Sequence, residues 1–387
     1  MPYNRPPLSK DALFDRPTAG TLDANPLARL LFSIRPSLAD VTWHLGVSAT
    51  AADLDRRVVT LSDGRQLSYD GLAVATGLTP RRLPLAGGEA DRHVVRTIDD
   101  ATRLGSALVP GANVVVAGGG FIGCEVAASA TKRGCMVTIV EPLAAPMLRS
   151  LGPQLAGAVQ AYHEANGVRF RLGTTVSGLG CETADQRRLR SVALDDGSEL
   201  PATVLIEAIG STCNTEWLTG NTLDLSDGVL TDNGLRAIGR ADVVAAGDVA
   251  RFPNPRFDTM ARRIEHWAIP ALTAKRAAAS LTAHLLGREH DAARFAPVPT
   301  FWSDQFGIRL QSMGLPGLAD RAELLEGSLP GSEQTTGHTP GHTPGHTIEQ
   351  SFFQGLAMGY WRGTALVCVV TIGLPAAQLT HYRGMLA

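Results

Sequence analysis

The sequence lacks an excess of charge of either sign and lacks closely spaced cysteines. Its 35 basic and 37 acidic residues give a formal net charge of −2, so electrostatics gives no reason to expect nucleic acid or an anionic membrane as a partner. The five cysteines are dispersed, with no C-x-x-C spacing. This pattern excludes a catalytic dithiol and is typical of reduced thiols in the cytoplasm, where we expect the protein to reside.

Long apolar runs and metal-ligand clusters are also missing. The longest apolar stretch, ALVCVVTIGLPAA at 365–377, is broken by Gly373 and Pro375, so it predicts a core strand and no membrane span. The first residues have neither a basic start nor an apolar run, and we expect no signal peptide. The repeat GHTPGHTPGHT at 337–347 has glycine and proline in each unit, which predicts a loop. No acid or cysteine repeats with its histidines, so we expect no metal site there.

One stretch, ANVVVAGGGFIGCEVAASATKRGCMVTIVEP at 112–142, contains a dinucleotide-binding pattern. A short apolar strand leads into Gly118, Gly120 and Gly123 in the spacing G-x-G-x-x-G, a helical segment follows, and a second strand ends at Glu141. The glycines permit a tight turn and close approach of a pyrophosphate at the helix N-terminus. Glu141 can accept hydrogen bonds from a ribose diol. Because this carboxylate would repel a 2′-phosphate, the pattern predicts NAD binding, with NADH favoured over NADPH.

Several separated stretches share their order with one known family. They are RPPLSK (5–10), YDGLAVATGLTPRRLP (69–84), the glycine turn, VLIEAIGSTCNTEWL (204–218), VVAAGDVA (243–250), EHW (265–267) and FWSDQ (301–305). Together they closely resemble the FAD-dependent NAD(P)H:ferredoxin and rubredoxin reductases, which have the pyridine nucleotide-disulfide oxidoreductase fold. The resemblance covers nearly the whole chain. It implies an NADH:ferredoxin oxidoreductase that passes electrons to a ferredoxin-type iron–sulfur partner of an oxygenase system.

The resemblance implies roles for individual residues around FAD and NAD. Arg5 and Lys10 would lie beside the flavin, and Glu125 would face Lys10 where the nicotinamide meets the flavin. Asp248 would bind the ribityl chain, and Trp302 would cover the isoalloxazine ring. The other cofactor-binding positions implied by the resemblance are Val47, Thr76, Gly77, Arg81, Gly210 and Gly247.

The flavin-binding part of the family pattern is incomplete in this sequence. Members of the family carry a first β-α-β unit ahead of RPPLSK, with its own G-x-G-x-x-G for the FAD pyrophosphate, whereas this sequence contains one such motif only. After EHW the family usually has asparagine, alanine and glutamine, and this chain has Ile269, Pro270 and Thr273. Cys213 stands where the family usually has proline. We therefore expect weak FAD binding or none.

The expected architecture is an α/β fold with two Rossmann-like dinucleotide-binding domains and a C-terminal α+β interface domain. The first of the two Rossmann-like domains is expected to be truncated at its N-terminus. The predicted segments are 1–93 and 219–296 for the FAD-type domain, 94–218 for the NAD-binding domain and 297–387 for the interface domain.

Two further hypotheses stay open. A flavin-free homologue would bind NAD only, or would use the vestigial cleft for non-redox chemistry or partner binding. A decayed fragment would have to cover the sheet edges left by the missing unit, through contacts in a homodimer or through repacking. An in-frame G-x-G-x-x-G in the upstream DNA would favour the reductase.

Overall fold

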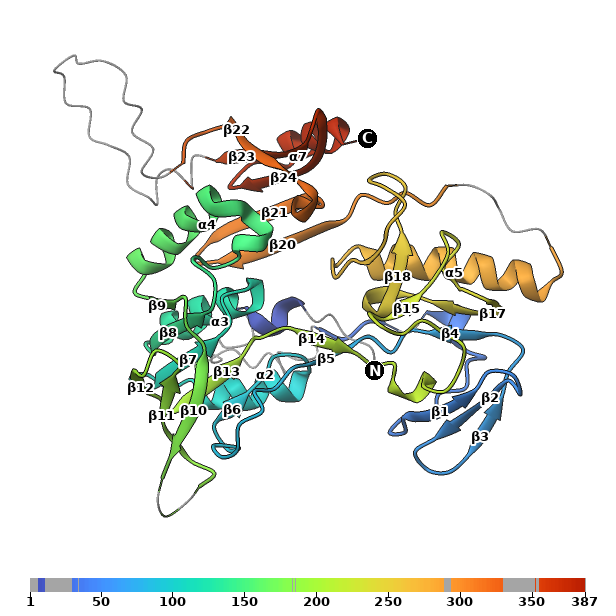
Figure 1. Cartoon of the computed structure of the whole chain (residues 1–387), viewed down its shortest axis with the longest axis horizontal. Coiled ribbons are helices and arrows are strands. Elements are labelled where there is room, and N and C mark those ends of the chain that lie inside the picture. The colour runs from blue at the N-terminus through green and yellow to red at the C-terminus, as the bar shows by residue number, and fades with distance from the viewer. Residues whose placement is uncertain are drawn as a thin grey trace. The chain divides into compact units, whose positions relative to one another are not determined.

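The chain forms two compact units, each built from separated segments (Figure 1). This computed structural model describes residues 6–10, 30–33, 35–182, 184, 186–288, 294–329, 352 and 355–386. Unit 1 comprises Met1–Ser33, Pro80–Gly210 and Trp302–Ala387, and unit 2 comprises Ile34–Thr79 and Ser211–Phe301. The chain therefore changes units after residues 33, 79, 210 and 301. The domain boundaries predicted after residues 93, 218 and 296 remain predictions.

A five-stranded parallel sheet forms the first half of unit 1. Its order is β6-β13-β7-β8-β9. The strands are β6 (Arg92–His93), β7 (Asn113–Ala117), β8 (Met136–Glu141), β9 (Arg169–Leu172) and β13 (Val204–Glu207). The three valines of β7 are fully buried, as expected for a central strand covered on both faces. Because β7 and β8 run parallel, with Ala117 opposite Val140, the glycine turn and Glu141 emerge at the same edge of the sheet.

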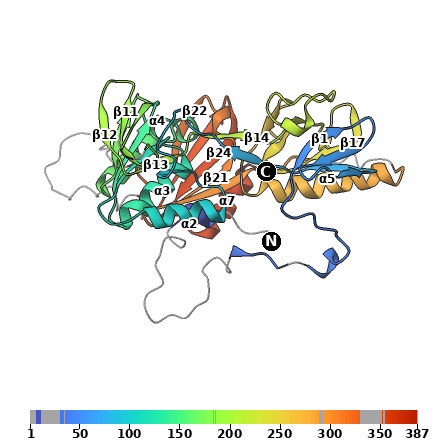
Figure 2. The ribbon, with the colours of Figure 1, turned by 90° about the horizontal axis from the view of Figure 1, so that it is seen from below.

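Three helices belong to this half of unit 1, namely α2 (Ile98–Ala107), α3 (Phe121–Lys132) and α4 (Leu148–Ala165). α2 begins with a capping box between Thr97 and Asp100, which satisfies backbone N–H groups of its first turn. Figure 2 shows α2 and α3 side by side, and the 3-10 helix η1 (Pro6–Ser9) packs against both. Leu8 of η1 is buried against Ala101 of α2. This packing holds the segment that carries Lys10 close to α3.

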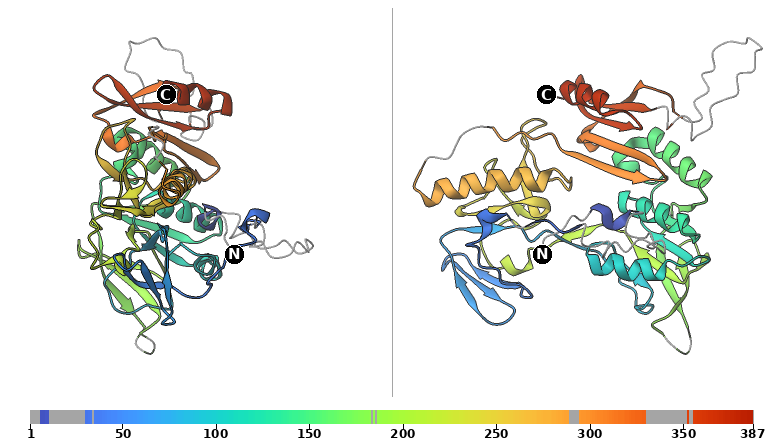
Figure 3. Two further views of the ribbon diagram at one scale, coloured as in Figure 1. Left: turned by 90° about the vertical axis from the view of Figure 1, so that its right-hand side faces the viewer. Right: turned by 180° about the vertical axis from the view of Figure 1, so that it is seen from behind.

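Two antiparallel sheets complete unit 1. The smaller contains β10 (Val176–Cys181), β11 (Leu189–Leu194) and β12 (Glu199–Pro201), and its apolar side chains share a core with the parallel sheet. The larger has the order β20-β21-β24-β23-β22, with β20 (Thr300–Gln305), β21 (Ile308–Gly314), β22 (Arg321–Glu326), β23 (Leu356–Arg362) and β24 (Ala365–Ile372). The 3-10 helix η6 (Pro316–Leu318) follows β21, and α7 (Ala376–Met385) packs against β24 (Figure 3).

A two-residue turn joins β20 to β21. Both of its residues have positive φ angles, 47° at Phe306 and 89° at Gly307, which is the backbone signature of a tight type I′ hairpin. The hydroxyl of Tyr162 on α4 donates to the carbonyl of Phe306 at 2.9 Å. The turn is therefore anchored to the helical part of unit 1.

Unit 2 is a set of small sheets with one long helix. Its sheets are β1 (Ala49–Asp53), β2 (Val58–Leu61) and β3 (Gln66–Ser68); β16 (Arg236–Ala237), β17 (Arg240–Ala245) and β4 (Leu72–Val74); β15 (Val229–Leu230), β18 (Ala250–Pro253) and β19 (Ala261–Arg263); and the pair β14 (Ser211–Cys213) and β5 (Leu78–Pro80). Its helices are α5 (Ile269–Leu285) and the 3-10 helices η3 (Pro36–Leu38), η4 (Glu216–Leu218) and η5 (Gly247–Val249). α5 lies against β16 and β17 (Figure 3).

The fold class predicted from the sequence is confirmed. The structure contains the parallel sheet with its crossover helices and the C-terminal antiparallel sheet. The segment after EHW forms the alanine-rich helix α5, with Pro270 in its first turn, where proline is tolerated. Within the described part of the chain, every helix is too short or too polar to cross a lipid bilayer.

Candidate dinucleotide-binding site

The glycine turn after β7 has no room for larger residues at two of its positions. Gly118 has a φ of 101°, and a Cβ atom there would lie 2.4 Å from the carbonyl oxygen of Ala208. A Cβ atom on Gly123 would lie 2.1 Å from the carbonyl oxygen of Gly118. Both contacts are with backbone atoms, which cannot swing away. The turn therefore requires glycine for the close packing of β7, α3 and the end of β13.

The second glycine of the motif, Gly120, faces open space. Gly120 is the N-cap of α3 and makes no side-chain capping bond, and a Cβ atom on it would meet nothing within 4 Å. The first-turn N–H groups of a helix have no partner within the helix. Together with the positive end of the helix dipole, this opening suits the pyrophosphate of a dinucleotide.

Glu141 lies at the end of β8, beside this turn, and its carboxylate is fixed by the backbone. Oε2 accepts a hydrogen bond from the Gly119 N–H at 2.7 Å, and Oε1 accepts one from the Leu143 N–H at 3.0 Å. Each carboxylate oxygen has a second lone pair. The buried acid can therefore keep both backbone bonds and still accept hydrogen bonds from ribose hydroxyls.

Lys10 and Glu125 come together, as the resemblance implies. Glu125 is buried on α3, and its Oε1 forms an ion pair with Lys10 Nζ. Its Oε2 accepts from the Ser9 hydroxyl, and its Oε1 also accepts from the Ser303 hydroxyl at 2.7 Å. Lys10 Nζ lies 3.7 Å from an oxygen of Asp304. The pair is thus enclosed by side chains from η1, α3 and β20.

Side chains alternate along the end of β20. Ser303 and Gln305 are buried, whereas Trp302 and Asp304 are partly exposed. This alternation follows from the two-residue period of a strand. It places Trp302 next to the residue that binds Glu125, on the opposite face of the strand.

Unit 2 holds four of the implied cofactor residues at the ends of two adjacent parallel strands. Thr76 and Gly77 follow β4, and Gly247 and Asp248 follow β17, with Val74 opposite Ala245 in the register. The Thr76 hydroxyl donates to the Asn214 carbonyl at 2.7 Å. The Gly247 N–H donates to Thr273 Oγ1 at 2.9 Å. Ligands of open α/β sheets bind at such strand ends.

The remaining implied residues are spread over both units. In unit 1, the Arg81 N–H donates to the Gly210 carbonyl at 3.0 Å, and Gly210 has a φ of 95°. In unit 2, Val47 is partly buried just before β1. Arg5 and the repeat at 337–347 lie outside the described residues.

Four polar residues around the Lys10–Glu125 pair were not predicted from the sequence as part of the site. Three of them, Ser9, Ser303 and Gln305, lie inside RPPLSK and FWSDQ, so the motifs signal their positions without giving their contacts. The fourth, His163 on α4, hydrogen-bonds Gln305 at 2.7 Å. A lone histidine in a helix gives no sequence signal for that contact.

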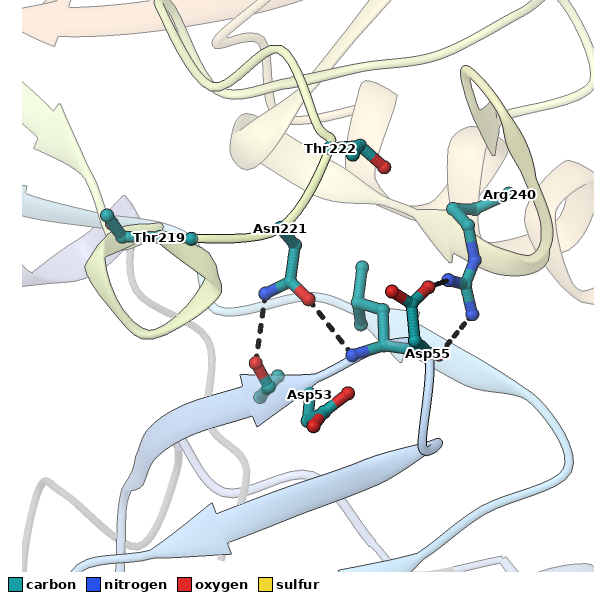
Figure 4. A pocket seen from close by; sticks show the side chains of 9 residues that line it. Asp53, Asp55, Thr219, Asn221, Thr222 and Arg240 are labelled. Atoms are coloured by element: carbon teal, nitrogen blue, oxygen red, sulfur yellow. Dashed lines mark hydrogen bonds and ion pairs between the residues drawn. The ribbon is translucent and has the colours of Figure 1, made fainter.

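A separate cavity of about 340 Å³ lies in unit 2 (Figure 4). Its wall includes the polar side chains of Asn221 and Arg240. Asn221 bridges Leu54 N and the Ala52 carbonyl, and Arg240 pairs with Asp55. Their polar groups are already bonded within the fold. We therefore assign this cavity no part in the dinucleotide site.

Comparisons with known proteins agree with this geometry. Residues 1–271 match the family described as pyridine nucleotide-disulphide oxidoreductase. Putidaredoxin reductase of Pseudomonas putida is 34% identical over 333 residues, covering 85% of this chain and 75% of that protein. The ferredoxin–NAD(+) reductase component of the anthranilate 1,2-dioxygenase system of Burkholderia cepacia is 35% identical over 322 residues, covering 82% of this chain and 74% of that protein.

Solved structures extend the likeness to the whole fold. A covalent putidaredoxin reductase–putidaredoxin complex matches with a TM-score of 0.82 and 29% identity, covering 100% of this chain and 84% of that chain. A ferredoxin reductase from Rhodopseudomonas palustris matches with a TM-score of 0.79 and 25% identity, covering 99% of this chain and 84% of that chain. The chain therefore belongs to the pyridine nucleotide-disulphide oxidoreductase family, which uses FAD and NAD(P)H, and lies close to the reductase components of ferredoxin-dependent oxygenase systems.

Proposed function

We propose that this protein is an NADH:ferredoxin oxidoreductase, which transfers electrons from NADH to a ferredoxin-type iron–sulfur protein with FAD as intermediary. The observation that carries the proposal is the glycine turn beside the buried acid Glu141, in a chain with ferredoxin reductases among its relatives. One relative was crystallised in a covalent complex with putidaredoxin, which supports a partner of that class.

The preference for NADH rests on Glu141. Its carboxylate is held in place by two backbone N–H groups, so it cannot turn away from a ligand at the turn. The residues that follow, Pro142, Leu143 and Ala144, offer no cation for a 2′-phosphate. A ribose diol would donate hydrogen bonds to the carboxylate, whereas a 2′-phosphate would be repelled by it.

The Lys10–Glu125 pair would serve the nicotinamide end of the ligand. Glu125 lies on α3, the helix whose N-terminus would bind the pyrophosphate. The ammonium of Lys10 is a donor and the carboxylate of Glu125 an acceptor, which complements the carbonyl and N–H groups of a carboxamide. We infer that the pair orients the nicotinamide ring for hydride transfer.

The residues present fit FAD only in part. Asp248 and Thr76 stand at neighbouring strand ends, where a ribityl chain would find polar partners. The sequence has one G-x-G-x-x-G, which we assign to the nicotinamide nucleotide, and the Gly247 N–H is already bonded to Thr273. FAD, when bound, would accept two electrons from NADH and release them singly to an iron–sulfur centre. We infer that this chain binds FAD weakly or not at all.

Three measurements on purified protein test the proposal. We expect a nearly colourless preparation, binding of NADH by titration calorimetry, and NADH-dependent reduction of a ferredoxin that rises when FAD is added. A preparation without NADH affinity would overturn the proposal. A yellow preparation with stoichiometric FAD would contradict weak flavin binding and would strengthen the reductase assignment.

A flavin-free homologue that binds NAD alone is the second candidate. The bond from the Gly247 N–H to Thr273 Oγ1 favours it, because it satisfies an amide at the strand end where the resemblance places the flavin. NADH binding without any ferredoxin reduction, even with excess FAD, would select this candidate. The vestigial cleft would then serve non-redox chemistry or partner binding.

We further propose a reducing compartment, the cytoplasm, and a homodimer. All five cysteines are unpaired, as expected where thiols stay reduced.

Sedimentation of the purified protein at several concentrations tests the proposed homodimer, and a constant monomer mass would contradict it.

A further inference from the structure

A chain of buried polar side chains lies behind Glu125 in unit 1. Ser303 Oγ donates to Glu125 Oε1 at 2.7 Å, and Gln305 Nε2 donates to Ser303 Oγ at 2.9 Å. At the far end, Gln305 Oε1 lies 2.7 Å from His163 Nε2. His163, Ser303 and Gln305 are each 2% exposed or less. Such groups are costly to bury unless their hydrogen bonds are made, so this series of hydrogen-bonded side chains is a specific structural feature of the core.

The direction of every hydrogen bond in this chain follows from its carboxylate end. A carboxylate only accepts, so the single hydroxyl proton of Ser303 points to Glu125. The lone pairs of Ser303 then face the amide N–H of Gln305, and the amide oxygen of Gln305 faces His163. His163 must therefore donate from Nε2. All three donors point toward Glu125.

The protonation state of His163 agrees with this direction. Its Nδ1 is buried without a hydrogen-bond partner in the described residues. Burial lowers the pKa of His163 to about 4, so the ring is neutral at physiological pH with its proton on Nε2. The rings of Phe306 and Phe170 face it edge-on, with centroids at 5.0 and 6.2 Å. They hold the imidazole without competing for its proton.

Gln305 is also connected to the glycine turn through Met147. Its Nε2 lies 3.8 Å from Met147 Sδ, within hydrogen-bonding range of sulfur. The Met147 N–H donates to the Gly119 carbonyl at 2.9 Å. Gln305 thus contacts one residue that holds the turn and one that holds Glu125.

We propose that Gln305 is a positioning residue for the Lys10–Glu125 pair, and that His163 orients its amide for that task. Residues from α4 and the C-terminal sheet are thereby connected to the N-terminal half of α3. The consequence for the ligand, a correctly placed nicotinamide, rests on the proposed function. The proposed effect on the geometry of the ion pair does not depend on the proposed function.

The rarity of lysine allows a direct test of the ion pair. The sequence contains only Lys10, Lys132 and Lys275, so protein labelled with ¹³C,¹⁵N-lysine gives three side-chain signals, assigned by Lys132→Arg and Lys275→Arg. Glu125→Gln defines the Lys10 signal of a broken pair. We expect Gln305→Met, which keeps the volume but loses the hydrogen bonds, to move the Lys10 signal toward that position. Ser303→Ala, a smaller change, should move it in the same direction.

Conservative variants separate positioning from general packing. We expect His163→Gln, which retains a donor near Nε2, to keep the wild-type Lys10 signal, and His163→Leu to move it. Gln160→Met, at the surface of α4 where Gln160 bonds only Glu164 among the described contacts, is the matched control and should change nothing. A Lys10 signal that stays at its wild-type position in folded Gln305→Met and Ser303→Ala would overturn the proposal.

Titration calorimetry with NADH adds a functional measurement that needs no flavin. Loss of one hydrogen-bonded support corresponds to about a five-fold weaker NADH affinity in Gln305→Met, with no change in Gln160→Met. If wild-type protein fails to bind NADH, the proposed function falls, and the lysine spectra still decide the positioning role. An unchanged Lys10 signal in folded Gln305→Met and Ser303→Ala would refute the positioning role whatever the NADH affinity. An unchanged NADH affinity in Gln305→Met would refute its consequence for the ligand.

Discussion

Acidification should destabilise unit 1 through His163. The pKa of this histidine falls from the ordinary 6.5 to about 4 because it is buried. Above pH 6.5 the folded and unfolded chains both hold it neutral, and it has no effect on the pH dependence of stability. Between pH 6.5 and 4 only the unfolded chain binds the proton, so the free energy of unfolding falls by about 1.4 kcal/mol per pH unit. The accumulated loss near pH 4 is about 3 kcal/mol.

Urea unfolding at a series of pH values between 7 and 4, about half a unit apart, measures this slope. The comparison is wild type against His163→Gln, which cannot titrate but keeps a donor for Gln305. We expect the slope of the transition of unit 1 to be smaller in the variant by about 1.4 kcal/mol per pH unit. His266 in unit 2, whose pKa burial also lowers to about 4, gives a matched variant, His266→Gln, that should affect unit 2 instead.

Two results would refute this reasoning. The first is a native His163 ring signal, followed by NMR with ¹³C-labelled histidine, that titrates near pH 6.5. The second is an equal slope in wild type and His163→Gln. Either result would mean that the imidazole is hydrated in the folded protein and that burial does not hold it neutral.

Three further predictions concern the glycine turn, Glu141 and Glu207 at the end of β13. Gly123→Ala forces a Cβ atom to 2.1 Å from a backbone oxygen, so it should lower the free energy of unfolding by more than about 2 kcal/mol. Gly120→Ala should fold normally and weaken only the binding of NADH, and thermal unfolding and calorimetry compare the two variants. Glu141→Ala should lower NADH affinity and narrow its advantage over NADPH, and calorimetry showing an unchanged ratio would contradict the role of the acid. Glu207 is fully buried between the guanidinium groups of Arg82 and Arg92, so Glu207→Gln should cost about 3 kcal/mol, and an unchanged urea midpoint would show that these charges contribute nothing.

The nucleotide half of the site is readable from the sequence because its parts are local. The glycine spacing, the apolar strand before it and Glu141 fall within 31 residues, at 112–142, and each has a backbone reason to be where it is. The structure adds what the pattern lacks, namely the bond between the Glu141 carboxylate and the Gly119 N–H. Local geometry of this kind follows from the motif once the two strands are known to be parallel neighbours.

The contacts around Glu125 are not local, and the sequence alone does not predict them. Lys10 and Ser303 approach Glu125 from 115 and 178 positions away, so the expected Lys10 contact depended on the family resemblance. The bond between His163 and Gln305 spans 142 positions and has no motif. It exists because α4 and β20 pack together, which is a property of the tertiary fold.

The alternation along β20 makes the site sensitive to chain length more than to residue type. A substitution at Trp302 or Ser303 changes one side chain, whereas one inserted or deleted residue would exchange the two faces of the strand. The buried row that supports Glu125 would then point outward, and the partly exposed row would enter the core. The Phe306–Gly307 turn fixes which face of the sheet each residue of β20 occupies. During evolution this strand can therefore accept substitutions of single residues far more readily than insertions or deletions.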